Sequence, residues 1–378
     1  MRILIDAGHP AHVHLFKNFA FKMLGEGHKV LFTCKDRENV VYLMNTYRFD
    51  FKSFGKHYHT GLGKVFGLVK NELQMLAACL KFKPDVFLSH GSTLAAFTSS
   101  LFGKPHIAFE DTFNLEQVRL SMPFTDVVLT GIYPHPNLGR KELHYPGYHE
   151  LAYLHPNVFA PDESVFEDLG LARGEKYAVV RFIAYHASHD FGHVGLSAND
   201  KLKLVESLSK HVRVIVSSEA ELQGALGRYQ LPIKPEKMHD VLAFASLFIG
   251  ESGTMATECA VLGVPNIQVR HEIDHNKVPG VHVDLVHRGL KLLYLNTDID
   301  GMISKSLELI DNPSIREQMR FARQNMLEEM IDVTGFLCWF VQNFPQSIEQ
   351  MRKGKDVFRP FRLVNRNLPE SFVPKLET

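Results

Sequence analysis

Hydroxyl and carboxylate side chains gather at one strand–helix junction, within the segment LFIGESGTMATECAVLGVPNI at 247–267. Gly253 in the turn lets the backbone approach a ligand, and the first amides of the following helix carry partial positive charge without internal partners. Together with the hydroxyls of Ser252 and Thr254, these amides suit a phosphate. Glu258 lies one turn further along the same face, where its carboxylate can accept hydrogen bonds from the vicinal hydroxyls of a ribose. The pattern therefore indicates a nucleotide diphosphate.

A second interpretation of this junction is purely structural. Ser252 or Thr254 would only cap the helix, and Glu258 would be solvated. A cap accounts for the hydroxyls, but the neighbours from Cys259 to Leu262 are apolar and belong to a helix that we expect to be buried. The position of Glu258 therefore favours the binding interpretation.

Three histidines, His9, His12 and His14, lie close together in the loop AGHPAHVHL. No Cys or acidic residue stands nearby at ligand spacing, and a helix that begins near residue 11 would turn His12 and His14 apart, so we expect no metal here. A neutral imidazole at His12 could instead remove a proton from an acceptor hydroxyl. The alternative is a structural histidine that bonds to the loop backbone.

Two further polar sites follow expected strands in the first half of the chain. The segment HGST at 90–93 opens a helix, so its amides, with His90 and Ser92, can bind a polar group. Glu110 ends another strand, and a carboxylate there can act as a general base or hold an acceptor hydroxyl. It could equally cap the following turn together with Asp111.

Two arginines end strands in the second half of the chain. Arg181 could neutralise a diphosphate through its forked guanidinium, and Arg270 follows the strand PNIQV. The loop after Arg181 adds polar side chains that we expect to contact substrate rather than metal, because no second carboxylate stands at ligand spacing. These side chains are His186, His189, Asp190 and His193.

The elements that must position these residues alternate regularly along the chain. Apolar strands followed by amphipathic helices predict parallel sheets with right-handed crossovers, and hence an α/β fold. We expect strands at 2–6, 29–33, 85–89, 106–109, 126–130, 177–182, 212–217, 247–250 and 265–269. We expect helices at 12–25, 64–82, 92–102, 199–210, 239–245, 254–262, 313–331 and 335–350.

A break in this alternation divides the chain. Residues 134–176 are rich in Pro, Gly and aromatic residues and are expected to be a connection. We therefore predict two doubly wound, Rossmann-like domains that face each other across a cleft, at 1–160 and 161–345, with a tail at 346–378. Ligands of such sheets bind beyond the carboxyl ends of the strands, which is where the polar residues named above lie.

The composition limits the classes of function. The chain has 378 residues, enough for two cores, and its 42 basic and 42 acidic residues balance, so we expect no nucleic-acid partner. Four scattered Cys indicate free thiols in a reducing compartment. With neither a secretory signal nor a membrane span evident, we expect a cytoplasmic protein. Lys, Arg and Phe residues after Arg352 could touch an acidic membrane surface, although packing on the protein or disorder better suits a chain end.

Three segments resemble GT-B enzymes, in the same order along the chain. SGTMATECAVLGVPNIQVR resembles the nucleotide-sugar site of UDP-GlcNAc 2-epimerases and of the UDP-GlcNAc transferase of peptidoglycan synthesis. GHPAHVHLFKNFAFKMLGEGHKVLFTC is similar to their first strand, loop and helix, and DVFLSHGSTLAAFTSSLFGKPHIAFED to the middle of their N-terminal domain. Overall the sequence resembles the uncharacterised DUF354 family, itself regarded as GT-B-like. The resemblance implies an N-terminal acceptor domain and a C-terminal nucleotide-sugar domain.

The resemblance also implies roles for matching residues. The turn at 252–254 would hold diphosphate, and Glu258 would hold ribose. His12 matches the His of a Gly-Gly-His loop in the transferase, and Glu110 matches a Glu used by both relatives. Arg270 matches an Arg of the epimerases.

Three functions follow as hypotheses. The first is a glycosyltransferase without metal or cofactor, which moves a sugar from a UDP-linked donor to a sugar or lipid-linked acceptor in surface polysaccharide or glycolipid synthesis. His12 or Glu110 would deprotonate the acceptor, while the helix at 254 and Arg181 would stabilise the leaving diphosphate. The second is a UDP-HexNAc 2-epimerase, opposed by Ser92, which stands where the epimerase motif His-Gly-Asp-Thr has a catalytic Asp, and by the absence of their His-Arg-Arg motif. The third is a nucleotide-sugar-binding protein without catalysis.

Overall fold

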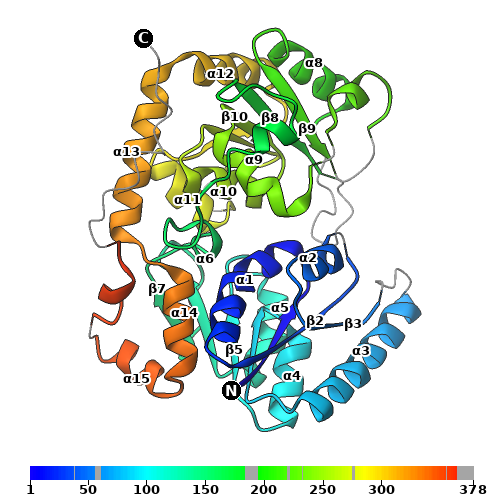
Figure 1. Cartoon of the computed structure of the whole chain (residues 1–378), viewed down its shortest axis with the longest axis vertical. Coiled ribbons are helices and arrows are strands. Elements are labelled where there is room, and N and C mark those ends of the chain that lie inside the picture. The colour runs from blue at the N-terminus through cyan, green and yellow to red at the C-terminus, as the bar shows by residue number, and fades with distance from the viewer. Residues whose placement is uncertain are drawn as a thin grey trace. The chain divides into compact units, whose positions relative to one another are not determined.

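The computed structural model describes residues 1–37, 39–55, 61–183, 195–218, 222–231, 233–274, 277–354 and 356–363. The chain forms two compact units (Figure 1). Unit 1 comprises Met1–Val158 and Met330–Arg362, and unit 2 comprises Phe159–Glu329 and Leu363. Each unit is built around its own parallel sheet, as the alternation of strands and helices predicts.

Unit 1 contains, within its described residues, a seven-stranded sheet in the order β3-β2-β1-β4-β5-β6-β7. The strands are β1 (Arg2–Ala7), β2 (Lys29–Cys34), β3 (Phe51–Ser53), β4 (Val86–His90), β5 (His106–Phe109), β6 (Val127–Gly131) and β7 (Glu142–Tyr145). Every pairing is parallel; Ile3 of β1 lies opposite Val30 on one side and Val86 on the other. The strand order reverses between β1 and β4, and sheets of this kind bind ligands beyond such a reversal.

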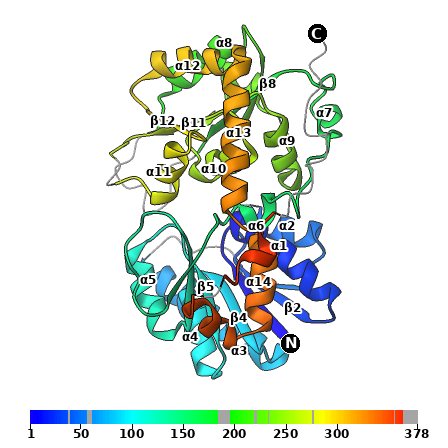
Figure 2. The same ribbon diagram turned by 90° about the vertical axis from the view of Figure 1, so that its left-hand side faces the viewer.

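Helices cover both faces of the unit 1 sheet (Figures 1 and 2). In one set, α1 (Pro10–Gly25) packs against α2 (Val40–Thr46), α6 (Leu151–Leu154) and α14 (Val333–Gln342). In the other set, α3 (Gly61–Phe82) packs against α4 (Thr93–Leu101), which packs against α5 (Leu115–Ser121). With both faces covered, the strands are almost continuously apolar and buried, as in other parallel sheets.

The chain returns to unit 1 after residue 329, which differs from the predicted domain boundary at 345. Helix α14 is apolar on nearly every side and is buried among unit 1 residues: Thr334 Oγ1 donates to Ala152 O over 2.6 Å, and the Phe336 ring lies 5.7 Å from that of Tyr145. The start of the predicted tail, with α15 (Gln346–Arg352), also belongs to unit 1. A long-range packing partner therefore decides this boundary, which the local pattern did not reveal.

Unit 2 contains a five-stranded parallel sheet in the order β12-β11-β10-β8-β9, counted over its described residues. The strands are β8 (Tyr177–Phe182), β9 (Arg213–Ser218), β10 (Leu247–Gly250), β11 (Asn266–Arg270) and β12 (Leu292–Leu295). Leu247 of β10 lies opposite Ala178 of β8, and Phe248 lies opposite Asn266 of β11. The order reverses between β8 and β10, so the ligand position expected for this sheet is beyond Arg181 and Gly250.

Helix α10 is central to one side of unit 2. It spans Gly253–Leu262 and packs against α9 (Met238–Phe244), α11 (Gly280–His287) and α13 (Pro313–Glu329), the long helix in the foreground of Figure 2. Arg323 of α13 donates from Nε to Val261 O over 2.8 Å. On the other side, α8 (Ala198–Leu208) and α12 (Ile299–Asp311) share an apolar core with the sheet. Helix α10 is thereby packed against three helices and the sheet of unit 2.

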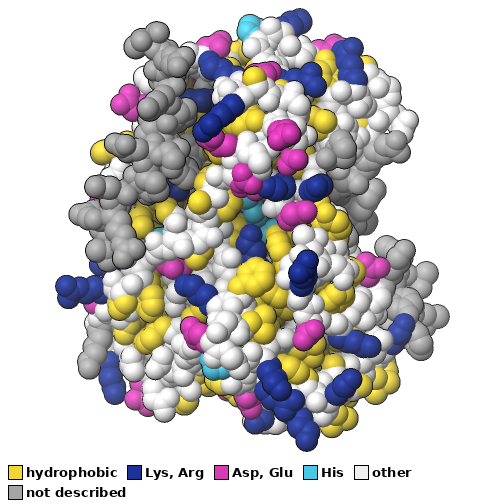
Figure 3. All heavy atoms as spheres, in the orientation of Figure 1, with side chains coloured by type: hydrophobic (Ala, Val, Ile, Leu, Met, Phe, Trp, Pro, Cys, Tyr) yellow, Lys and Arg dark blue, Asp and Glu magenta, His cyan; other side chains and the backbone are white. Residues whose placement is uncertain are grey.

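Most expected elements are confirmed. Strands β3, β7 and β12 were not predicted, nor were helices α2, α5, α6, α7 (Val165–Asp168), α11 and α12. β7, α6 and α7 lie in the segment 134–176 that was expected to be a connection. β7 and β12 lie at sheet edges, where few neighbours impose an apolar pattern. No described helix is long and apolar enough to cross a membrane. On the face shown in Figure 3, Lys and Arg side chains occur together with Asp and Glu on both units.

Candidate functional site

The predicted phosphate turn lies beyond the strand reversal of unit 2. Ser252 is the N-cap of α10, and its Oγ accepts a hydrogen bond from Met255 N over 3.3 Å. Ser252 and Gly253 are half-buried and Thr254 is exposed. The structural interpretation of Ser252 as a cap is therefore confirmed, yet the helix terminus itself reaches the surface, as phosphate binding requires.

Glu258 lies inside the protein, not in solvent. Its side chain is buried, with the residue 4% exposed, and His239 Nε2 of α9 lies 3.1 Å from Glu258 Oε1. This contact with His239 orients the Glu258 carboxylate, which lies one helical turn after Thr254. The solvated alternative is wrong, because a carboxylate stays this deeply buried only with hydrogen-bond partners.

Glu251, directly before the N-cap residue Ser252, forms hydrogen bonds that the sequence did not predict. Its carboxylate is buried; Oε2 accepts from Ile183 N over 3.1 Å and Oε1 from Leu196 N over 2.8 Å. One side chain thus ties together the two ends of the segment 184–194. That segment contains His186, His189, Asp190 and His193, which lie outside the described residues.

The two arginines of the predicted site are held at the sheet edge. Arg181 donates from Nη1 to Ser217 Oγ of β9 over 2.8 Å, and Arg270 donates from Nε to Glu272 O over 3.1 Å. The backbone of Gly250 is in close contact with Arg181. A Cβ added to the glycine would lie 2.5 Å from Arg181 O, so a larger residue would clash there. Both guanidinium groups are therefore oriented by oxygen atoms near their own strands, and their contact with a diphosphate stays a prediction.

A cluster of histidines lies beyond the strand reversal of unit 1. The rings of His12 and His90 stack with centroids 4.5 Å apart. His90 Nε2 lies 2.8 Å from Asp111 Oδ1, and His149 Nδ1 lies 3.2 Å from Asp111 Oδ2. His14 turns away to lie 5.6 Å from the ring of Tyr153, so the expected divergence of His12 and His14 is confirmed.

The three side chains His12, His90 and Asp111 differ in charge. Burial opposes charge on His90, but the carboxylate of Asp111 and the hydrogen bond to it outweigh burial and raise the pKa of His90 to about 9. Burial, and then the neighbouring His90, hold the pKa of His12 well below its usual value. At neutral pH a neutral His12 therefore stacks on a cationic His90 that is paired with Asp111. Sequence reasoning considered Asp111 only as a cap and missed His149; the strand order brings the two residues to His90.

The neutral His12 has a defined tautomer. Gly8 N donates to His12 Nδ1 over 3.3 Å, so the ring proton sits on Nε2. In this state His12 donates a hydrogen bond to an acceptor oxygen, and it must change tautomer before it can take a proton. The geometry thus favours His12 as a hydrogen-bond donor through Nε2 over a base at that nitrogen.

Glu110 supports the turn that follows β5. Its Oε1 accepts from Thr112 N over 2.9 Å, from Thr112 Oγ1 over 2.7 Å and from Phe113 N over 2.8 Å. Phe113 has φ 50°, in the left-handed region that side chains rarely adopt, so these bonds hold a strained turn. The capping interpretation is confirmed for Oε1, while Oε2 is directed toward Gly91.

Ser92 is engaged by a neighbouring acid. Its Oγ accepts from Ala95 N as the N-cap of α4 and donates to Asp6 Oδ2 over 2.6 Å. Asp6 also accepts from Thr33 Oγ1 over 2.7 Å, and burial raises the pKa of the Asp6 carboxyl despite these two bonds. Ser92 is thus part of an internal bridge between β1, β2 and α4.

Two groups of side chains have spacing that could hold a divalent cation. The ligand atoms of His90, Asp111 and His149 lie within 4.8 Å of one another, as do those of a second group, His135, Glu142 and His144. In the first group both imidazoles already bond to the carboxylate, so the arrangement is stable as a hydrogen-bonded ion pair. Among the described residues, His9, His12 and His14 do not form a group of this kind.

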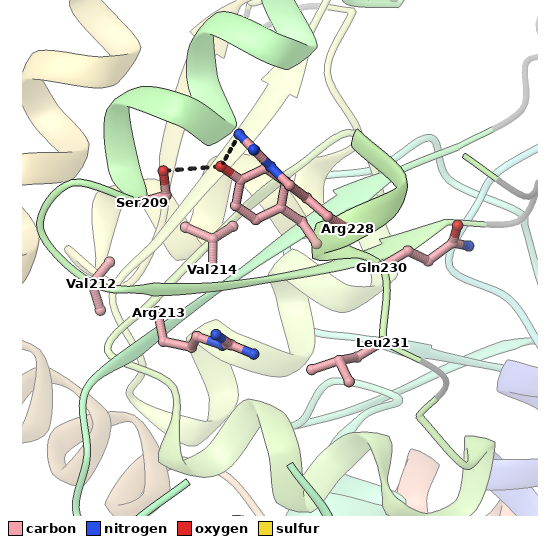
Figure 4. Close-up of a pocket in the computed structure, with 8 residues that line it drawn as sticks. Ser209, Val212, Arg213, Val214, Arg228, Gln230 and Leu231 are labelled. Atoms are coloured by element: carbon pink, nitrogen blue, oxygen red, sulfur yellow. Dashed lines mark hydrogen bonds between the residues drawn. The ribbon is translucent and has the colours of Figure 1, made fainter. Parts of the chain in front are cut away.

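A cavity of about 430 Å³ in unit 2 lies away from these residues (Figure 4). It is lined by the start of β9 with Val212, Arg213 and Val214, and Figure 4 shows Arg228 lying along it. Tyr229 OH lies 3.2 Å from Ser209 Oγ and accepts from Arg228 Nη2 over 2.9 Å. Because ligands of parallel sheets bind at the carboxyl ends, this hollow at the amino end of β9 is not the expected substrate site.

Comparison with known proteins defines a family. The family model described as "Protein of unknown function (DUF354)" matches residues 1–335. An uncharacterized protein of Methanocaldococcus jannaschii, MJ0665, is 25% identical over 279 residues, which cover 70% of this chain and 80% of that protein.

Solved structures share the fold at low identity. The putative UDP-N-acetylglucosamine 2-epimerase of Listeria monocytogenes has a TM-score of 0.65 at 14% identity, over 96% of this chain and 99% of that chain. MurG of Acinetobacter baumannii has a TM-score of 0.57 at 16% identity, over 90% and 99%. The UDP-GlcNAc 2-epimerase of Neisseria meningitidis, solved with UDP-GlcNAc bound, has a TM-score of 0.57 at 13% identity, over 87% and 99%. The predicted GT-B fold, with two Rossmann-like units, is confirmed.

Proposed function

The chain belongs to the DUF354 family, and we propose that this member is a glycosyltransferase that takes its sugar from a UDP-linked donor. One observation carries the proposal: the N-terminus of α10 is exposed at Thr254, and the next turn holds the buried carboxylate of Glu258. A helix terminus suits diphosphate, and a carboxylate one turn away suits the ribose hydroxyls. Fold neighbours that include MurG and an epimerase with bound UDP-GlcNAc support the choice of donor.

The reaction is a direct displacement at the anomeric carbon of the donor sugar. The acceptor oxygen forms the new bond while the bond to the diphosphate breaks, and UDP leaves. Amides at the N-terminus of α10 stabilise the charge that develops on the leaving group, so the proposal invokes neither metal nor cofactor. Arg181 and Arg270 are proposed to add positive charge on the donor side.

The acceptor proton goes to a group of unit 1. His12 binds the acceptor oxygen through Nε2, and Glu110 is a base through Oε2, since Oε1 is occupied by the turn. His90 and Ser92 are proposed to contribute to the acceptor-binding region of unit 1. A sugar or lipid-linked acceptor suits surface polysaccharide or glycolipid synthesis in the cytoplasm, with peripheral contact to the membrane.

Binding and turnover test the proposal directly. Wild-type protein should bind UDP in calorimetry and release UDP from a UDP-sugar only when an acceptor is present. Glu258→Gln keeps the shape and the contact with His239 but weakens a charge-assisted bond to ribose, so UDP affinity should fall about 10- to 100-fold. Glu206→Gln on α8, which removes a half-buried carboxylate paired with Arg228, is the matched control and should bind UDP like the wild type. Equal UDP affinity in Glu258→Gln and wild type would sink the proposed site.

A second candidate function, 2-epimerisation of a UDP-HexNAc, has one specific observation in its favour. Ser92 cannot itself act as an acid, but its hydroxyl lies 2.6 Å from Asp6 Oδ2, and burial raises the pKa of that carboxyl. Product analysis separates the two functions. Formation of the 2-epimer, or of UDP with the free mannosamine sugar, and its loss in Asp6→Asn, would establish epimerisation. Tight binding without any product would indicate a non-catalytic nucleotide-sugar-binding protein.

A further inference from the structure

A buried lysine organises the polar groups behind the N-terminus of α10. Lys291 precedes β12 and is 1% exposed. Its Nζ lies 2.8 Å from both Thr257 Oγ1 and His282 Nδ1, and 3.4 Å from Gln268 Oε1. Gln268, on β11, is 2% exposed and His282, on α11, is 8% exposed. Four polar side chains from separate elements thus meet in the interior of unit 2.

The ammonium group fixes where its neighbours carry their protons. A lysine ammonium donates three hydrogen bonds and accepts none. Gln268 must therefore turn Oε1 to Lys291, which places the amide hydrogens of Nε2 on the opposite side. His282 accepts at Nδ1 and so carries its proton on Nε2. Thr257 accepts from Lys291 and donates its own proton to Gly253 O over 3.0 Å.

These oriented donors converge on one residue. A methyl group added to Gly253 would lie 3.1 Å from Gln268 Nε2 and 3.2 Å from His282 Nε2. Gln268 Nε2 has no hydrogen-bond partner among the described residues, although its side chain is almost completely buried. The nitrogen is not completely buried, because it is not among the fully buried side-chain atoms without a partner, so it can donate to water or to a ligand. The unmet donor therefore points to a ligand oxygen beside Gly253.

We propose that Lys291 is a positioning residue that aims Gln268 Nε2 and His282 Nε2 at the diphosphate of the donor. The inference rests on the proposed function and specifies its leaving-group subsite. The first amides of α10 and the two oriented side-chain donors surround the same oxyanion, and the buried ammonium adds positive charge behind them. Because the donors are oriented before the ligand arrives, they need no reorganisation when charge develops in the reaction.

Gln268→Glu tests the orientation with a change of one atom. One carboxylate oxygen keeps the bond to Lys291, and the other replaces the amide donor with a negatively charged acceptor facing Gly253. Affinities for UDP and for uridine, which lacks phosphate, are measured by calorimetry. The UDP affinity should fall at least tenfold, whereas the uridine affinity should stay at the wild-type value.

Lys291→Met tests the positioning role. Without the ammonium, Gln268 and His282 can reverse and present acceptors to the anion. The ratio of UDP to uridine affinity should fall at least tenfold, and nitrogen-15 NMR should show His282 as a mixture of tautomers instead of the Nε2–H form. Lys305→Met is the control, because it removes the same charge from an ion pair with Glu308 on α12 and should leave the ratio unchanged.

The outcomes separate this inference from the proposed function. If the wild type binds UDP and both variants keep the wild-type ratio of UDP to uridine affinity, the inference is overturned while the nucleotide site stands. If the wild type binds no nucleotide or nucleotide sugar, the proposed function and the inference are overturned together. Should circular dichroism show Lys291→Met to be unfolded, the ratio in Gln268→Glu decides alone.

Discussion

The two units contain the same strand–cap–helix junction in opposite electrostatic surroundings. Ser92 caps α4 with φ −78° and ψ 114°, and Ser252 caps α10 with φ −76° and ψ 115°. At the first junction the Ser92 hydroxyl donates to Asp6, and Glu110 Oε2 lies beside Gly91. At the second, amide and imidazole donors lie beside Gly253.

The comparison teaches that backbone geometry alone does not make a phosphate site. Both helix termini carry the same partial positive charge, because this charge arises from the peptide groups. Carboxylates around α4 offset that charge, whereas Lys291, His282 and Gln268 reinforce it at α10. We therefore expect the nucleotide to bind to unit 2, and the polar groups of unit 1 to serve proton transfer and acceptor binding.

Ser252→Asp should give the largest effect on binding. Asp is as good an N-cap as Ser, so stability should stay within about 0.5 kcal/mol of the wild type. Its carboxylate would repel the diphosphate by about 3 kcal/mol, which lowers UDP affinity more than 100-fold. Calorimetry with UDP measures the loss, and urea unfolding checks the stability. Retained UDP affinity would mean that α10 is no more a phosphate site than α4.

Ser92→Asp, the matched change at the α4 cap, should act on stability instead. It would place a second carboxylate next to Asp6, and repulsion should destabilise unit 1 by about 2 kcal/mol at pH 7. The loss should shrink at acidic pH as one carboxyl becomes protonated. Hydrogen exchange of unit 1 amides measures this loss of stability. UDP affinity should be unchanged. A drop in UDP affinity equal to that of Ser252→Asp would remove the distinction between the two junctions, and gain of epimerase activity would revive the second candidate function.

Unit 1 should also be the more sensitive to acid, through His106. Burial lowers the pKa of His106 to about 3, whereas the unfolded chain titrates near 6.5. The unfolded state then binds the extra proton, so the stability is complete above about pH 6.5 and falls by about 1.4 kcal/mol per pH unit below it, until pH 3. His106→Gln should remove this slope from urea unfolding curves. His211→Gln, at an exposed position, is the control; an equal slope in both variants would contradict the assignment.

Thr254→Ala should give the smallest effect. The Thr254 hydroxyl is exposed at the α10 terminus, and a single hydroxyl contact with phosphate contributes about 0.5 to 1 kcal/mol. UDP affinity should fall about two- to fivefold in calorimetry, without a change in unfolding free energy. Leu94→Ala, at the equivalent position of α4, should leave UDP affinity unaltered. A loss as large as that in Ser252→Asp would show that Thr254 has a greater role than one neutral contact.

Local sequence predicted the junction at the start of α10 best. Ser252, Gly253 and Glu258 lie within one junction and its helix, so the helical period already sets their relative positions. It also predicted the alternation of strands and helices, and hence two parallel sheets. It did not predict the direction of Arg181, whose Nη1 turns to Ser217 on the neighbouring strand.

The histidine cluster of unit 1 shows why the remaining contacts could not be predicted without the fold. His90 and Asp111 are both visible as polar residues after strands, but their 2.8 Å contact depends on β4 and β5 being neighbours. Asp6 meets Ser92 because β1 lies next to β4. The sequence predicts the polar residues that follow each strand, but the strand order determines which of these residues lie close together.

By itself the sequence determined the two α/β units and the composition of the α10 terminus, because strand and helix periods and the capping residue act over a few neighbouring positions. Only the tertiary structure decided that Gln268 and His282 meet beside Gly253 with Lys291 bonded to both, and that α14 returns to unit 1. The physical reason is that hydrogen bonds and burial depend on distance in space, which the chain sets through strand order and helix packing and not through sequence separation.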